Sequence, residues 1–138
     1  MWTHNRYPFI HDMAEMKELI AEIRKPNVGF LLDIWHWYTA GNTVRDVLTL
    51  KNHDVVAVHM SDAPAGIPVE QQIDNHRELP LATGVIDTSG FLNALNRVGY
   101  DGPAAAEPFN AALRALPADE ALAKTADAMK KAFALIKS

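Results

Sequence analysis

The chain has 138 residues, of which 49% are hydrophobic and 22% are charged, as expected for one globular domain over residues 1–138 with a substantial core. Its net charge of −4, without a lysine or arginine cluster, argues against nucleic-acid binding. No cysteine is present, so neither a disulfide nor a thiolate metal site is expected, which fits a cytoplasmic protein. The N-terminal residues do not resemble a signal peptide, and no apolar run approaches the roughly 20 residues of a membrane span.

The first part of the chain predicts a loop followed by an amphipathic helix. Residues 1–11 show no clear periodicity and are expected to form a lead-in loop. Asp12 is a suitable N-cap, with Glu15 in the capping-box position three residues later. Apolar side chains then recur at helical spacing as far as Ile23, and Pro26 ends the predicted helix.

Short apolar segments predict three strands that are covered on both faces. They cover residues 28–32, 55–58 and 103–106, the last with three alanines of low β-propensity. Residues 60–86 form a connection rich in proline and glycine, and a connection of that length in a compact domain is usually functional or disordered. The remaining helices are predicted at residues 43–51, 87–98 and 119–136. Strands alternating with helices predict a parallel sheet and an α/β fold.

Each predicted strand leads to a residue type that binds metals. Asp33, His59 and Glu107 follow the three apolar segments. Because chemistry in parallel α/β folds gathers at the carboxyl ends of strands, we expect these side chains to meet. Carboxylates with one imidazole suit Mn²⁺, Co²⁺, Zn²⁺ or Mg²⁺. The alternative is that the acids cap helices and His59 is a hydrogen-bonded core residue.

Four segments, DIWHWYTAG, VHMSDAPAG, NHRELPLATGVID and GYDGPAAAEPF, carry a resemblance to a known family. Together they resemble the C-terminal part of the xylose-isomerase-like TIM-barrel superfamily of sugar isomerases and epimerases, from about Tyr7 to Phe109. The resemblance implies a partial (β/α) barrel with about three parallel strands and four helices, not a closed barrel. It also implies one divalent metal held by Glu, Asp, His and Glu. Asp33, His59 and Glu107 match the last three ligands.

The resemblance implies further roles at the same site. His36 would bind substrate hydroxyls, and Arg77 would hold a hydroxyl or carbonyl oxygen of the substrate. Glu107 would be one of two carboxylates that transfer a proton. Trp35 and Trp37 could form an apolar wall against a sugar face. Residues 60–86 would then be an active-site loop.

Each of these side chains also has a structural explanation. His36 and the two tryptophans could pack in the core or at an interface. Arg77 could be exposed and pair with Glu78. Asp62 and Asp74 are expected to be solvated or to cap backbone groups. Four other histidines are expected at the surface or at caps: His4, His11, His53 and His76.

Two parts of the family pattern are missing or altered. The first glutamate ligand, also the expected catalytic base, would lie before Met1, and residues 1–11 contain no carboxylate to replace it. The family's Gly-Glu-Gly-like stretch is replaced by residues 81–84. Three strands also leave both edges of the sheet open. We therefore expect a fragment, one piece of a split protein, or a subunit that completes its sheet by association with a copy or a complementing fragment.

Three functions remain open at this stage. The first is a metal-dependent isomerase or epimerase, or a truncated piece of one, that removes a proton from a sugar, polyol or keto acid and forms an enediolate. The second is a dehydratase of the same superfamily, which would then expel water. The third is a non-catalytic remnant or assembly module. A repair role like that of endonuclease IV is disfavoured, because the chain lacks a multi-metal, His-rich ligand set.

Overall fold

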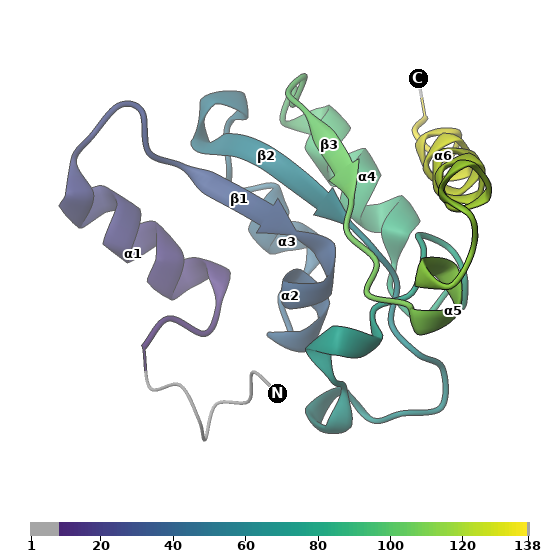
Figure 1. Cartoon of the computed structure of the whole chain (residues 1–138). Helices are drawn as coiled ribbons and strands as arrows, with labels where there is room; N and C mark the ends of the chain where they lie inside the picture. Colours follow the sequence, from purple (N-terminus) through teal and green to yellow (C-terminus); the bar gives the residue numbers. More distant parts are fainter. Residues whose placement is uncertain (1–8, 138) are drawn as a thin grey trace.

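The computed structural model describes residues 9–137, and it contains an open parallel sheet with helices packed around it (Figure 1). The strands are β1 Phe30–Asp33, β2 Val55–Met60 and β3 Ala104–Ala106, in the order β1-β2-β3. Both pairings are parallel. The α/β class and the partial barrel predicted from the sequence are therefore confirmed. Most of the predicted lead-in loop, residues 1–8, lies outside the described residues.

Helices lie behind the sheet and at its sides in Figure 1, with α1 beyond β1 and α6 beyond β3. The α-helices of the described region are α1 Met13–Ile23, α2 Ile34–Thr39, α3 Val44–Val47, α4 Thr88–Arg97, α5 Ala111–Arg114 and α6 Ala118–Phe133. Short 3₁₀-helices are η1 Asn52–Asp54, η2 Val69–Gln71 and η3 Asp74–His76. Within residues 9–137, no helix combines the length and apolarity that crossing a bilayer requires.

The two faces of the sheet differ because successive side chains of a strand point to opposite sides. Leu32 of β1 and Val58 of β2 are buried in one hydrophobic cluster with Phe91 of α4. Leu31, on the other face of β1, is 55% exposed. Asp33 shares this second face. The helices therefore cover one face of the sheet, and the candidate ligands stand on the other.

Register places the three candidate ligands on the same face and at the same end. Asp33 is paired with His59, and His59 is paired with Ala105. Glu107 is two residues beyond Ala105 and thus returns to the same face. The backbone N–H of Glu107 donates to the carbonyl of Met60 at 2.9 Å, which continues the ladder just past β3.

Several predicted boundaries are wrong. The helix expected at residues 43–51 ends at Val47, because the N–H of Leu50 bonds to the Val47 carbonyl in a tight turn. Residues 34–39 form the unpredicted helix α2, so the described chain has more helices than the four expected. The strand expected at 28–32 covers Phe30–Asp33, and the final helix ends at Phe133 instead of residue 136.

The long connection between β2 and α4 is ordered around Asp62. This side chain is fully buried, and its two carboxylate oxygens accept hydrogen bonds from four backbone N–H groups at 2.7–3.1 Å. The donors are Ala63, Thr83, Gly84 and Ile86. Backbone hydrogen bonds also join Asp62 to Glu78. Asp62 thus caps backbone groups as predicted, although it does so as a buried residue. These hydrogen bonds fix the course of the connection that contains Arg77.

Candidate metal and substrate site

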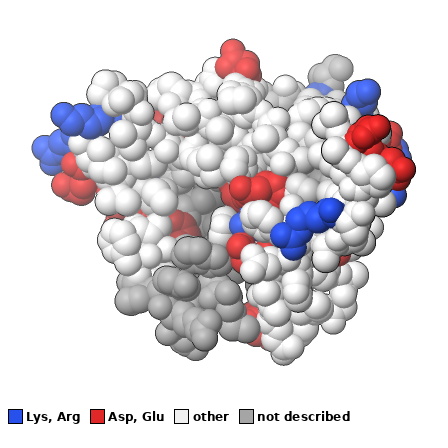
Figure 2. Space-filling view, viewed as in Figure 1, with Lys and Arg blue, Asp and Glu red and all other residues white. Residues whose placement is uncertain are grey.

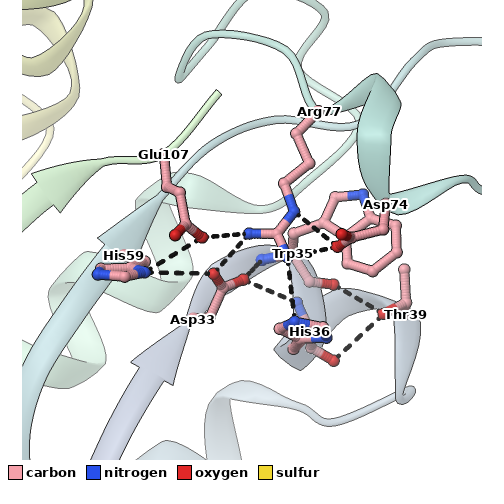
Figure 3. Close-up of polar contacts among 8 residues, drawn as sticks. All are labelled: Asp33, Trp35, His36, Thr39, His59, Asp74, Arg77 and Glu107. Atoms are coloured by element: carbon pink, nitrogen blue, oxygen red, sulfur yellow. Dashed lines mark hydrogen bonds and ion pairs between the residues drawn. The ribbon is translucent and has the colours of Figure 1, made fainter. Parts of the chain in front are cut away.

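The structure brings together the three side chains that the sequence singled out as metal ligands (Figure 3). Ligand atoms of Asp33, His59 and Glu107 all lie within 4.8 Å of one another. His59 Nδ1 is 3.2 Å from Glu107 Oε2 and 3.8 Å from Asp33 Oδ2. Atoms at this separation can share one ion, since metal–ligand distances for nitrogen and oxygen are about 2.0–2.2 Å.

Asp33 divides its two oxygens between the helix that follows and the site. Its Oδ1 accepts hydrogen bonds from the backbone N–H groups of Trp35 and His36, at 2.8 and 3.0 Å, and so caps α2. Its Oδ2 faces His59 and Arg77. Asp33 can therefore cap α2 with one oxygen and bind a metal with the other, so the two interpretations from the sequence do not exclude each other.

Arg77 lies at the centre of the site and is only 3% exposed. Its Nη1 donates to Asp33 Oδ2 at 2.8 Å and to Glu107 Oε2 at 2.6 Å. Its Nε and Nη2 donate to Asp74 Oδ1 at 3.0 and 2.5 Å. The alternative of an exposed arginine that pairs with Glu78 is therefore wrong. Instead, three carboxylates surround one guanidinium.

Two aromatic rings flank the same guanidinium. Arg77 Cζ is 5.0 Å from the ring centroid of Trp35 and 5.0 Å from that of Phe109. These distances lie within the range of cation–π contacts. Trp35 is 1% exposed, so its ring packs against the guanidinium and presents little surface to solvent. Its contact with a substrate stays a prediction.

Trp37 also lies inside the molecule. It is 6% exposed, its ring centroid is 5.2 Å from that of Phe91, and its Nε1 donates to the carbonyl of Thr43 at 3.1 Å. These contacts anchor α2 to α4 and to the start of α3. The predicted contact of Trp37 with a substrate is likewise left as a prediction.

His36 contacts Arg77 through its Nε2 atom, which is 3.0 Å from Arg77 Nη2. A guanidinium has only donors, so Nε2 accepts and the proton of the neutral ring is on Nδ1. Desolvation lowers the pKa of His36, the carboxylate of Asp33 opposes this shift, and the charge of Arg77 adds to it. His36 is therefore neutral at pH 7.

Sequence reasoning missed Asp74 and Phe109 as partners of Arg77. Asp74 was expected to be solvated or to cap backbone groups, yet its side chain binds the guanidinium from within η3. The available signal was the spacing of three residues between Asp74 and Arg77, which brings side chains together on a helical turn. Nothing in the sequence indicated that Phe109 would lie against the same group.

A cavity of about 280 Å³ borders the site between α1 and β1. Its lining includes Met13, Met16, Leu31, Leu32, Asp33 and His36. Figure 2 shows acidic side chains at the centre of this face of the molecule, with positive side chains beside them. A small molecule in the cavity would thus meet apolar walls together with Asp33 and His36.

Comparison with known proteins assigns the chain to a family. A sequence profile described as xylose isomerase-like TIM barrel matches residues 1–132. The chain belongs to this family. A solved structure of a xylose isomerase domain protein from Alicyclobacillus acidocaldarius is 36% identical, with a TM-score of 0.78 over 94% of this chain and 46% of its own. The IOLI protein, solved with a zinc atom, shares the fold, with a TM-score of 0.85 and 22% identity over the same shares of each chain.

The curated relatives include isomerases, an epimerase and a dehydratase. The chain is 25% identical to an inosose isomerase of Bacillus subtilis, covering 91% of this chain and 46% of the relative. It is 29% identical to a ketose 3-epimerase of Arthrobacter globiformis, over 68% and 28% of the two chains. It is 29% identical to a 3-dehydroshikimate dehydratase of Pseudomonas aeruginosa, over 72% and 16%. The chain spans less than half the length of each of these relatives.

Proposed function

We propose that this chain carries part of the active site of a metal-dependent sugar or polyol isomerase or epimerase that works in the cytoplasm. The observation that carries the proposal is the convergence of Asp33, His59 and Glu107 at one end of a parallel sheet. Relatives named inosose isomerase and ketose 3-epimerase support a small polyhydroxylated substrate.

The donor set fits a single divalent ion. Two carboxylate oxygens face one imidazole nitrogen, and Nδ1 of His59 is directed at both acids. This set suits Mn²⁺, Co²⁺, Zn²⁺ or Mg²⁺, and three protein ligands leave room for water or substrate. When bound, such an ion supplies positive charge that stabilises the oxygen of an enediolate.

Other side chains of the site would transfer the proton and bind the substrate. Glu107, whose side chain is 34% exposed, would move a proton at the carbon next to a carbonyl. Arg77 offers a fixed positive charge to a hydroxyl or carbonyl oxygen of the substrate. Neutral His36 would donate from Nδ1 to a hydroxyl. The buried Trp35 keeps the guanidinium of Arg77 in place.

A dehydratase is the second candidate, because a 3-dehydroshikimate dehydratase is among the relatives. Both reactions begin with removal of a proton next to a carbonyl. They differ in the next step, since the isomerase returns the proton and the dehydratase loses water. The products therefore distinguish them.

Proton exchange tests the proposal. The protein is incubated in D₂O with Mn²⁺ and a panel of ketoses, inososes and cyclic keto acids, and the products are followed by NMR. We expect deuterium to enter at the carbon next to the carbonyl of at least one compound, together with an isomer or epimer. Loss of water instead would indicate the dehydratase.

Glu107→Gln is the informative variant, with Glu120→Gln on the exposed surface of α6 as its matched control. We expect the first to reduce exchange at least about 100-fold, the lower range for loss of an acid–base group, and the second to leave it unchanged. Absence of exchange with Mn²⁺, Co²⁺, Zn²⁺ and Mg²⁺ across the panel would favour the non-catalytic remnant.

A further inference from the structure

We infer that Arg77 is a built-in cation of the site, which occupies the metal-binding carboxylates in the metal-free protein and lowers their affinity for divalent ions. The inference rests on the proposed function, because it requires that Asp33, His59 and Glu107 bind a metal. It adds a role for Arg77 that differs from contact with a substrate.

Arg77 and a metal would use the same oxygen atoms of the site. Nη1 alone donates to Asp33 Oδ2 and to Glu107 Oε2. These two oxygens are also the atoms that face Nδ1 of His59. A metal ion bound by the three ligands would therefore have to coordinate oxygens that already accept hydrogen bonds from the guanidinium.

Arg77 is also held by contacts that do not involve the candidate metal ligands. Asp74 accepts hydrogen bonds from Nε and Nη2, and Figure 3 shows it on the side of the guanidinium away from His59 and Glu107. The rings of Trp35 and Phe109 flank the group at 5.0 Å each. The guanidinium can thus lose its hydrogen bonds to Asp33 and Glu107 and still be held in the site by Asp74 and the two rings.

Arg77 also sets the net charge of the site. Three carboxylates, those of Asp33, Asp74 and Glu107, surround one guanidinium, so these four groups carry a net charge of −2. One divalent ion neutralises that charge. Without Arg77 the net charge would be −3, and a unit positive charge would no longer repel the metal from a few ångströms away.

Calorimetric titration with Mn²⁺ tests the inference on the wild type, Arg77→Gln and Arg97→Gln. Arg97 is an exposed arginine on α4, so its variant removes the same charge outside the site. We expect Arg77→Gln to bind Mn²⁺ at least tenfold more tightly than the wild type, whereas Arg97→Gln should match the wild type.

Thermal unfolding of the same variants separates this role from a structural one. The metal-free Arg77→Gln protein should unfold at a lower temperature than the wild type, because Asp33 is buried and loses its partner. We therefore expect Arg77→Gln to have a lower Tm without metal than the wild type and a higher affinity for Mn²⁺. Unchanged or weaker Mn²⁺ binding by Arg77→Gln would overturn the inference and leave the proposed function in place. If the wild type binds none of Mn²⁺, Co²⁺, Zn²⁺ and Mg²⁺ in the same titration, the inference and the proposed function both fail.

A measurement on the wild type covers the case in which Arg77→Gln does not fold. Zn²⁺ is titrated into ¹⁵N-labelled protein, and the arginine Nε–H resonances are followed by NMR. We expect the resonance of Arg77 to shift as the site fills, while that of Arg97 stays constant. An unchanged Arg77 resonance at saturation with Zn²⁺ would overturn the inference.

Discussion

Two buried aspartates at the ends of β1 and β2 organise the site by different means. Asp33 uses one oxygen to cap α2 and directs the other at His59 and Arg77. Asp62 uses both oxygens to hold the backbone of the connection that follows β2. The first residue therefore contributes a candidate ligand, whereas the second determines where Arg77 is placed.

Asp62→Asn is expected to destabilise the protein severely. An amide has one acceptor oxygen, so whichever way it is oriented its NH₂ group faces backbone donors that the carboxylate satisfied. Leaving such buried donors without partners costs about 3 kcal/mol or more in the free energy of unfolding. Urea denaturation measures this loss. Asp101→Asn is the control, since Asp101 is exposed and accepts one hydrogen bond, from Asn52. A difference below about 1 kcal/mol between the two variants would contradict the role given to Asp62.

The sequence was sufficient to predict the ligand residues but not the environment of Arg77. Asp33, His59 and Glu107 follow apolar segments, so alternation and strand order place them at one edge. Arg77 lies in a connection whose path depends on hydrogen bonds that Asp62 accepts from backbone N–H groups more than 20 positions away. No local pattern encodes such contacts, and its burial was therefore not predicted.

Short helices join the strands, and α3 depends on its first turn. The backbone N–H of Thr43 donates to Asp46 Oδ2 at 2.6 Å, and the Thr43 hydroxyl donates to the same oxygen at 2.8 Å. These hydrogen bonds lower the pKa of Asp46 below its ordinary value of 3.8. The ionised carboxylate thus stabilises the start of a helix that is only four residues long.

Asp46→Ala should therefore destabilise the protein in a pH-dependent way. Because the pKa of Asp46 is lower in the folded state, its contribution is present above the unfolded value and is lost as the pH falls through the folded value. At pH 7 we expect a loss of about 0.5–1 kcal/mol, as for other helix caps. At pH 3 the difference from the wild type should shrink. Urea unfolding at both pH values checks this, and an equal loss at pH 3 and pH 7 would contradict it.

Helix boundaries were harder to predict than helix existence. The helix α1 was predicted from Asp12 to Ile23 and is observed at Met13–Ile23, because capping and periodicity agree there. The helix α2 was missed, since its sequence IWHWYT follows a strand directly and has no amphipathic period. Its formation depends on the cap that Asp33 provides, a contact visible only in three dimensions.

At the scale of the whole molecule, the sheet is open on both sides within residues 9–137. β1 and β3 are its edges, and Leu31 of β1 and Val56 of β2 are each 55% exposed. Unpaired strand edges near exposed apolar side chains are typical of a sheet to which further strands add. The open edges were predictable by counting strands, but the sequence does not indicate what covers them.

The central claim is that Asp33, His59 and Glu107 together hold one divalent ion, and thermal unfolding with and without metal tests it most directly. An ion at 100 times its dissociation constant adds about 2.7 kcal/mol to the free energy of unfolding. We predict that at least one of Mn²⁺, Co²⁺, Zn²⁺ and Mg²⁺ raises the Tm of the wild type. Asp33→Asn, His59→Ala and Glu107→Gln should each lose this increase relative to their own metal-free Tm. His53→Ala, the control on an exposed histidine, should retain it. A Tm that none of the four ions raises, or an increase that survives all three ligand substitutions, would contradict the claim.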